Sequence, residues 1–111
     1  MTASISVKEV DTIIFACEAG VGSSLMSVNS LKKLLKKANV KVNVVNKAAR
    51  SIPQDAKVVV VHRGLFEVAR KQAPQAVILA FQHFLNDPVF DGIVKSFVDG
   101  TCLLQTWSPP T

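Results

Sequence analysis

The strongest constraint on the fold is one stretch in which an apolar run, a loop of small residues and an amphipathic run follow each other. The apolar run covers residues 12–16, the loop covers 17–24, and the amphipathic run covers 25–38. This order predicts a strand, a tight loop of small residues and a helix. The free N–H groups and the dipole at a helix N-terminus attract anions. The stretch therefore predicts an α/β fold with a loop that holds phosphate.

Cys17 stands at the expected strand exit, where the field that attracts phosphate also stabilises a thiolate, the nucleophilic form of cysteine. Gly20 and Gly22 allow the backbone to curl closely around an anion. Ser23 and Ser24 can cap the helix or donate their hydroxyls to an anion. Most single cysteines are small core residues. The position of Cys17 before two glycines, two serines and a helix makes a catalytic role as well supported as a structural one. We predict that Cys17 carries a phosphoryl group covalently.

The length of the chain limits what it can do alone. Its 111 residues are enough for one domain with a single hydrophobic core. The longest apolar run, 76–81, is too short to span a membrane, so a role in transport would need a membrane partner. Cys17 and Cys102 make no disulfide framework, which indicates the reducing cytosol. Residues 1–10 are expected to be a leader or linker, 11–100 the domain, and 101–111 a tail that either packs or extends.

The net charge is positive, formally +5, and much of the excess falls on one expected helix. Only 6% of the residues are aromatic, and no nucleic-acid-binding motif is present, so we expect no nucleic-acid partner. A basic surface also suits an acidic protein partner or a phosphorylated donor. We interpret the polar helix face mainly as a solvated surface that can share a docking role; it carries Lys32, Lys33, Lys36 and Lys37.

Strands and helices are expected to alternate along the rest of the chain, which predicts βαβ units and a parallel sheet of four strands. Asn39 is a suitable C-cap for the first helix, and Gly100 for the last. Met26 is expected in the core. The strands are predicted at 11–16, 40–45, 57–61 and 76–81, the last three buried, and the helices at 25–38, 65–72 and 88–98.

Polar residues follow three of these strands at the point where each strand ends. Cys17 follows the first strand, His62 and Arg63 follow the third, and residues 82–83 (Gln-His) follow the fourth. Ligands of open parallel sheets bind beyond the carboxyl ends of the strands. We therefore expect these residues to gather at one edge of the sheet and to form the site.

Several segments resemble a known family. Residues 17–26, Cys-Glu-Ala-Gly-Val-Gly-Ser-Ser-Leu-Met, resemble the phosphocysteine loop of the enzyme IIB component of the bacterial sugar phosphotransferase system (PTS). The mannitol-type loop reads Cys-Asp-Ala-Gly-Met-Gly-Ser-Ser-Ala-Met. Residues 62–65, 73–76 and 84–85 resemble the family's His-Arg-Asp-Leu, Val-Pro-Gln-Ala and Asn-Phe-Leu segments, and the likeness covers about 11–98. The loop is shared with ascorbate and galactitol types, whereas the other segments favour the mannitol type.

The resemblance implies an α/β three-layer sandwich, in which about three helices flank the four-stranded parallel sheet, like that of low-molecular-weight tyrosine phosphatases. It implies that a phosphorylated IIA protein passes phosphate to Cys17, which passes it to a sugar or polyol, mannitol-like, held by the membrane component IIC. The domain would be cytoplasmic and would meet the inner face of the membrane through IIC. No metal or cofactor is implied beyond the phosphocysteine. The phosphate-binding amides would come from Ala19, Gly20, Val21, Gly22, Ser23 and Ser24.

Three further residues are candidates for secondary roles. Glu18 either faces solvent or helps to recognise IIA or IIC. His62 can be structural or functional, and Arg63 is a candidate phosphate contact or docking residue. Gly64 stands where the family has Asp, so any hydrogen bond of that Asp is absent or replaced.

Two alternatives stay open at this point. Domains of the IIB type also occur as regulatory modules in regulators of sugar operons, but this chain has no DNA-binding segment. A low-molecular-weight phosphatase would need Cys-x5-Arg, and Ser23 occupies the Arg position. It would also need an Asp-Pro acid loop, whereas the Asp-Pro pair at 87–88 is assigned to a helix start.

Overall fold

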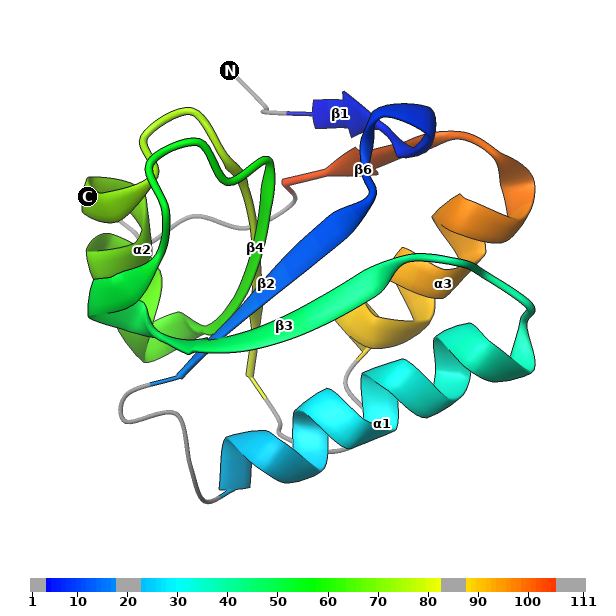
Figure 1. Ribbon diagram of the computed structural model, residues 1–111, viewed down its shortest axis with the longest axis horizontal. Coiled ribbons are helices and arrows are strands. Elements are labelled where there is room, and N and C mark those ends of the chain that lie inside the picture. The colour runs from blue at the N-terminus through cyan, green and yellow to red at the C-terminus, as the bar shows by residue number, and fades with distance from the viewer. Residues whose placement is uncertain (1–3, 18–22, 83–87, 106–111) are drawn as a thin grey trace.

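The computed structural model describes residues 4–17, 23–82 and 88–105, with residues 17 and 23–25 described by their backbone alone (Figure 1). Strands and helices alternate through most of this range. The strands are β1 (Ser4–Ser6), β2 (Thr12–Cys17), β3 (Asn43–Ala48), β4 (Val58–His62), β5 (Val77–Phe81) and β6 (Cys102–Leu104). The helices are α1 (Ser23–Lys37), α2 (Phe66–Gln72) and α3 (Pro88–Asp99), with short 3-10 turns at Val7–Glu9, Ala49–Ser51 and Arg63–Leu65.

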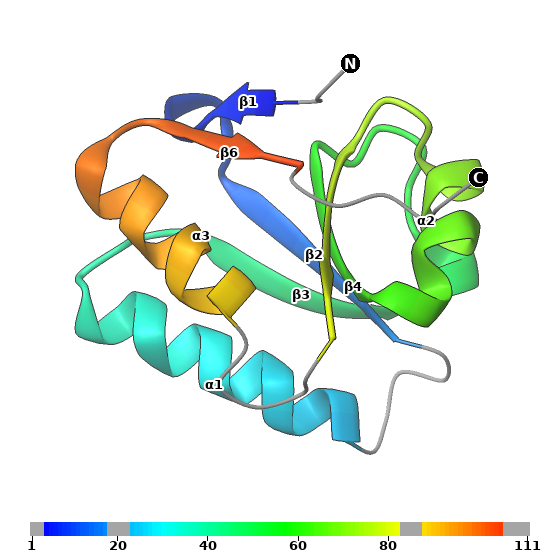
Figure 2. The same cartoon turned by 180° about the vertical axis from the view of Figure 1, so that it is seen from behind.

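The main sheet has four parallel strands, as predicted, and the structure places them in the order β3-β2-β4-β5. Helices α1 and α3 cover one face and α2 covers the other, which confirms the three-layer α/β architecture (Figures 1 and 2). Because side chains alternate across a strand, the valines of β4 divide between the two faces. All four are buried, so the expectation of a strand covered on both faces is confirmed.

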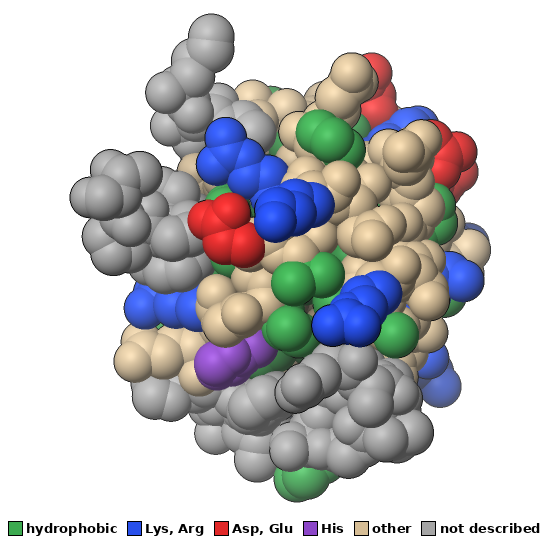
Figure 3. All heavy atoms as spheres, turned by 90° about the vertical axis from the view of Figure 1, so that its left-hand side faces the viewer, with side chains coloured by type: hydrophobic (Ala, Val, Ile, Leu, Met, Phe, Trp, Pro, Cys, Tyr) green, Lys and Arg blue, Asp and Glu red, His purple; other side chains and the backbone are tan. Residues whose placement is uncertain are grey.

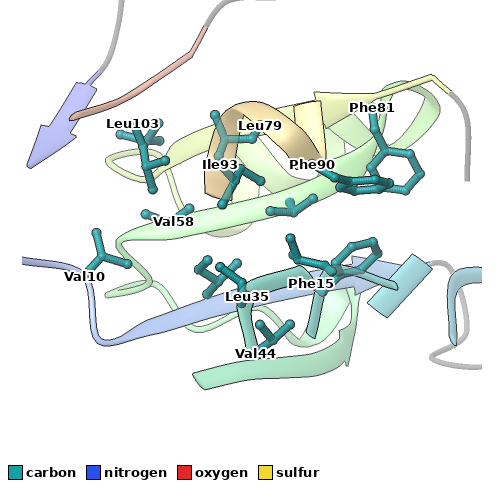
Figure 4. Close-up of a cluster of buried hydrophobic side chains, with 14 of the residues drawn as sticks. Val10, Phe15, Leu35, Val44, Val58, Leu79, Phe81, Phe90, Ile93 and Leu103 are labelled. Atoms are coloured by element: carbon teal, nitrogen blue, oxygen red, sulfur yellow. The ribbon is translucent and has the colours of Figure 1, made fainter. Parts of the chain in front are cut away.

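The two faces of the sheet have cores of different composition. Under α1 and α3, the rings of Phe15, Phe81 and Phe90 pack together with centroids 5.3–6.1 Å apart (Figure 4). Under α2 the core contains smaller residues, six of them alanines at 16, 49, 69, 73, 76 and 80, around Phe66.

The second strand differs from its prediction in both place and burial. It was expected at 40–45, whereas β3 begins at Asn43 and lies at the edge of the sheet. Asn39 ends α1 in the left-handed conformation, with φ 60°, and the N–H of Val40 bonds back to Leu35. Residues 40–42 connect α1 to the sheet, and β3 begins at Asn43, where pairing with β2 starts. An edge strand is covered less completely, and Val45 is 37% exposed.

Two short strands form a second sheet that the sequence did not predict. β1 pairs with β6 in antiparallel register, Ser4 opposite Leu104 and Ser6 opposite Cys102, near the amino ends of the main strands (Figure 2). Leu103 is 2% exposed and joins the core under α1 and α3, together with Val7 and Val10. Segments 4–10 and 101–104 thus pack against the sheet; the domain limits at 11 and 100 remain a prediction.

Candidate functional site

The carboxyl edge of the main sheet brings together the strand exits that the sequence singled out. β2 ends at Cys17, which pairs with Ala48 of β3, and β4 ends at His62, which pairs with Phe81 of β5. Between β2 and β4 the register places Phe15 opposite Val60. Continued by two residues, this register sets His62 level with Cys17 on the neighbouring strand.

The start of α1 completes the strand–loop–helix unit around Cys17. α1 begins at Ser23, six residues after Cys17 and two residues before the predicted helix start at residue 25. The N-terminus of this helix therefore lies on the same side of the sheet as the strand exits (Figure 1). Such a terminus offers N–H groups and a positive dipole end to an anion. Five loop candidates lie outside the described residues: Glu18, Ala19, Gly20, Val21 and Gly22.

A hydrogen bond and a ring contact help to hold His62 at this edge. Its Nδ1 accepts a hydrogen bond from the backbone N–H of Gly64 at 3.2 Å. Its ring lies edge-on to Phe81, with centroids 5.6 Å apart and planes at 78°. Since Nδ1 is an acceptor, the neutral imidazole carries its proton on Nε2. The side chain is half-buried, and histidine reaches the surface on the face that includes α2 (purple in Figure 3).

Arg63 connects two of the strand exits. Its Nη1 donates to Oε1 of Gln82 at 3.1 Å, across 19 residues of sequence. Arg63 follows β4 and is half-buried, whereas Gln82 follows β5 and is exposed. A guanidinium fixed in this way suits recognition of phosphate oxygens. The position of Gln82 at an exit was predicted, but its bond with Arg63 has no signal in the sequence. His83 lies outside the described residues.

Gly64, which departs from the family's Asp, has room for a side chain. A Cβ at this position would meet Nδ1 of His62 at 3.4 Å, an ordinary contact. An Asp side chain there would begin beside the His62 ring. The hydrogen bond that now holds Nδ1 comes from the Gly64 backbone, so it does not depend on the side chain at this position.

Two other residues considered from the sequence, Cys102 and Met26, are exposed. Cys102 is exposed on β6 and has a free thiol. Met26, expected in the core, is 56% exposed on α1, which corrects that expectation: it faces away from the positions that α1 buries, such as Val28. Over residues 4–17, 23–82 and 88–105, no group of three or more His, Cys, Asp or Glu side chains could hold a metal ion. No helix in those ranges has the length and apolar character to cross a membrane.

Comparison with known proteins connects this geometry to one family. The family model described as "PTS system, Lactose/Cellobiose specific IIB subunit" matches residues 12–95. The chain is 37% identical over 91 residues to the "PTS system mannitol-specific EIICB component" of Bacillus subtilis strain 168, covering 82% of this chain and 19% of the relative. It is 39% identical over 89 residues to the component of that name in Staphylococcus saprophyticus, covering 79% and 18%.

A third relative extends the match. The "PTS system mannitol-specific EIICBA component" of Buchnera aphidicola is 35% identical over 102 residues, which cover 91% of this chain and 16% of the relative. The chain thus spans about one fifth or less of the length of these relatives. The matched segment contains both the strand–loop–helix unit and the exits of β4 and β5.

Proposed function

Because the chain belongs to the PTS IIB family, we propose that it is the phosphoryl relay of a sugar phosphotransferase system. Cys17 accepts the phosphoryl group from a phosphohistidine of a IIA protein and passes it to a sugar or polyol held by a membrane IIC component. The mannitol-specific names of the relatives support mannitol or a similar polyol as the acceptor. The domain acts on the cytoplasmic side and meets the membrane through IIC.

The observation that carries the proposal is the place of Cys17 at the carboxyl end of β2, six residues before α1 begins. A thiolate there lies in the field of the helix N-terminus. In the first transfer, sulfur attacks phosphorus, the P–N bond to the donor histidine breaks and a P–S bond forms. In the second, the acceptor hydroxyl gives its proton to solvent, its oxygen forms a P–O bond, and the P–S bond breaks to restore the Cys17 thiolate. Both transfers proceed without a cofactor.

The loop and its neighbours have separate roles in this relay. The amides and hydroxyls of Ala19, Gly20, Val21, Gly22, Ser23 and Ser24 hold the phosphate oxygens. Arg63, fixed by Gln82, contributes positive charge at the same edge, and the Nε2–H of His62 is a further donor. Glu18 and the exposed Met26 contribute to the surface that meets IIA or IIC.

The test is transfer of labelled phosphate from phosphoenolpyruvate through the general PTS proteins and a mannitol-type IIA. Intact mass is measured before and after mild cleavage of thiophosphate esters. The unmodified chain and Cys102→Ser should each gain one phosphoryl group, and Cys17→Ser should gain none while folding normally. Equal labelling of all three proteins would contradict the role of Cys17. Hydrolysis of a model phosphate ester without labelling would indicate a phosphatase, and neither activity would indicate a regulatory module.

A further inference from the structure

A basic groove lies between the second half of α1 and the first half of β3, apart from the proposed phosphate site. Its volume is about 530 Å3. In Figure 1 the two elements run side by side and are joined beyond the amino end of β3. Apolar side chains, among them Leu35 and Val44, line it together with three lysines, Lys32, Lys36 and Lys41.

One wall of the groove is a sheet edge with peptide groups that point outward. The N–H of Asn43 donates to the carbonyl of Asp11 at 3.0 Å, so the peptide groups of Asn43 face β2. In a parallel ladder these directions alternate, and the N–H and C=O of Val44 therefore face away from the sheet. No described strand pairs with this side of β3, which is the first strand in the sheet order.

On the opposite edge of the sheet, an outward backbone N–H is hydrogen-bonded by a side chain of the protein itself. The N–H of Val77 donates to the carbonyl of Lys57, on the side of β4. Because neighbouring peptide groups alternate, the N–H of Ile78 faces outward, as the N–H of Val44 does on the other edge. Oε1 of Gln105 accepts from this N–H of Ile78 at 3.2 Å. Gln105 thus satisfies one outward N–H of β5, whereas β3 borders the groove.

The charge at the groove has one sign. Lys32, Lys36 and Lys41 are all exposed, and the groove lining includes no Asp or Glu. Compensation of the helix dipole explains Lys36, which lies in the last turn of α1. It does not explain Lys32, one turn earlier, or Lys41, which lies beyond the helix.

We propose that this groove docks an extended acidic segment of a partner protein, which adds a strand to the free edge of β3. The outward N–H and C=O of Val44 would pair with the backbone of the segment, which is how sheet edges bind peptides. Its carboxylates would lie against the three lysines, and its apolar side chains would cover the apolar wall. The proposal is independent of phosphoryl transfer.

The position of the groove allows docking and chemistry to proceed together. Val44 lies four residues before Ala48, the residue that pairs with Cys17. At about 3.3 Å per residue, the docked segment would be centred roughly 13 Å from the carboxyl edge. A partner held there leaves the thiol accessible, so docking would raise the local concentration of a partner without blocking transfer.

The probe is a synthetic hexapeptide of alternating valine and glutamate with blocked ends. It is added to the 15N-labelled chain at low salt and followed by amide chemical shifts and hydrogen exchange. We expect saturable shifts centred on residues 43–45, slower exchange of the Val44 N–H, and weaker binding as salt is raised. A peptide with proline at alternate positions cannot form the ladder and should bind at least about tenfold more weakly.

Two double variants of α1 provide a matched test of the lysines. Lys32→Glu with Lys36→Glu reverses charge inside the groove, and Lys33→Glu with Lys37→Glu makes the same change on the same helix outside it. The first pair should weaken peptide binding at least about tenfold, and the second by less than about threefold. Circular dichroism checks that both variants fold.

Three results would overturn the proposal. One is the absence of shifts at residues 43–45 at about 1 mM peptide, the weak end of specific binding. Another is equal loss of binding in the two double variants. The third is concentration-dependent dimerisation through residues 43–45 in sedimentation that the peptide fails to displace, because the edge would then pair with a second copy. Labelling of Cys17 is measured separately, so failure here leaves the relay untouched.

Discussion

The two ends of the main sheet are built for different purposes. At the carboxyl end the strands stop at Cys17, His62 and Phe81, and a hydrogen bond between Arg63 and Gln82 connects polar side chains that reach solvent. At the amino end lies the β1–β6 pair, and Val7, Val10 and Leu103 are buried there. We call the amino end the closed end and the carboxyl end the open end. One end keeps polar groups accessible, and the other removes apolar surface from water.

This difference indicates which residues of the protein mainly affect stability and which mainly affect the proposed phosphoryl transfer. Burial of a leucine-sized side chain contributes about 1.5–3 kcal/mol, so the closed end stabilises the whole sheet. The proposed phosphate site would have to admit two partners, and Gln82 is exposed at this end, although Phe81 beside it is buried. Substitutions at the amino end should change stability, and those at the carboxyl end should change transfer.

The largest effect on stability is expected for Leu103→Ala at the closed end. The side chain is buried in the core under α1 and α3, and its removal leaves a cavity. We expect the free energy of unfolding to fall by about 2–5 kcal/mol. Urea denaturation measures the loss. Labelling of Cys17 should stay normal under conditions where the variant is folded, and loss of labelling in the folded variant would break the comparison.

The next effect belongs to the open end. Arg63→Gln removes the guanidinium that bonds Gln82, and we expect phosphoryl transfer to Cys17 to slow about tenfold. Rapid-quench labelling with a phosphorylated IIA measures the rate. Arg70→Gln, an exposed position on α2, is the matched control and should leave the rate unchanged. If both variants transfer at the parent rate, Arg63 has only a structural role.

A smaller loss is expected for Gly100→Ala at the closed end, between α3 and β6. Gly100 has φ +71°, in the left-handed region that an alanine adopts with difficulty. The free energy of unfolding should fall by about 1 kcal/mol, measured by thermal or urea denaturation. Gly92→Ala, where nothing lies within 4 Å of the added Cβ, is the control and should not destabilise α3. A neutral Gly100→Ala would contradict the backbone argument.

The smallest effect is expected for Gly64→Asp at the open end, which introduces the family's residue. The new Cβ meets His62 at 3.4 Å, and the backbone hydrogen bond to Nδ1 is kept. Stability should change by less than about 0.5 kcal/mol, as for most surface substitutions. Denaturation and an NMR spectrum of the His62 ring test this. A loss of 2 kcal/mol or more would mean that the open end is packed as tightly as the closed one.

Local patterns predicted much of the fold and part of the site. The valines of β4, the loop before α1 and the C-cap at Asn39 were identified because periodicity and turn chemistry are properties of neighbouring residues. The same patterns placed Cys17, His62 and Gln82 at one edge of the sheet, since parallel strands end together.

Contacts between distant segments escaped prediction. Strands of three residues, such as β1 and β6, are too short to show an alternating pattern, so their pairing had no signal. The bond between Arg63 and Gln82 depends on β4 and β5 being neighbours. The burial of β3 was overestimated because a valine-rich run does not reveal whether its strand lies inside the sheet or at its edge.

The sequence by itself determined the strand–loop–helix unit around Cys17, the parallel α/β sheet and the family, because these depend on the order of residues along the chain. Tertiary structure decided which end of the sheet is closed, which strand has a free edge, and which side chains hold His62 and Arg63 in place. The physical reason is that burial and hydrogen bonding depend on neighbours in space, and these are fixed only when the strands have paired.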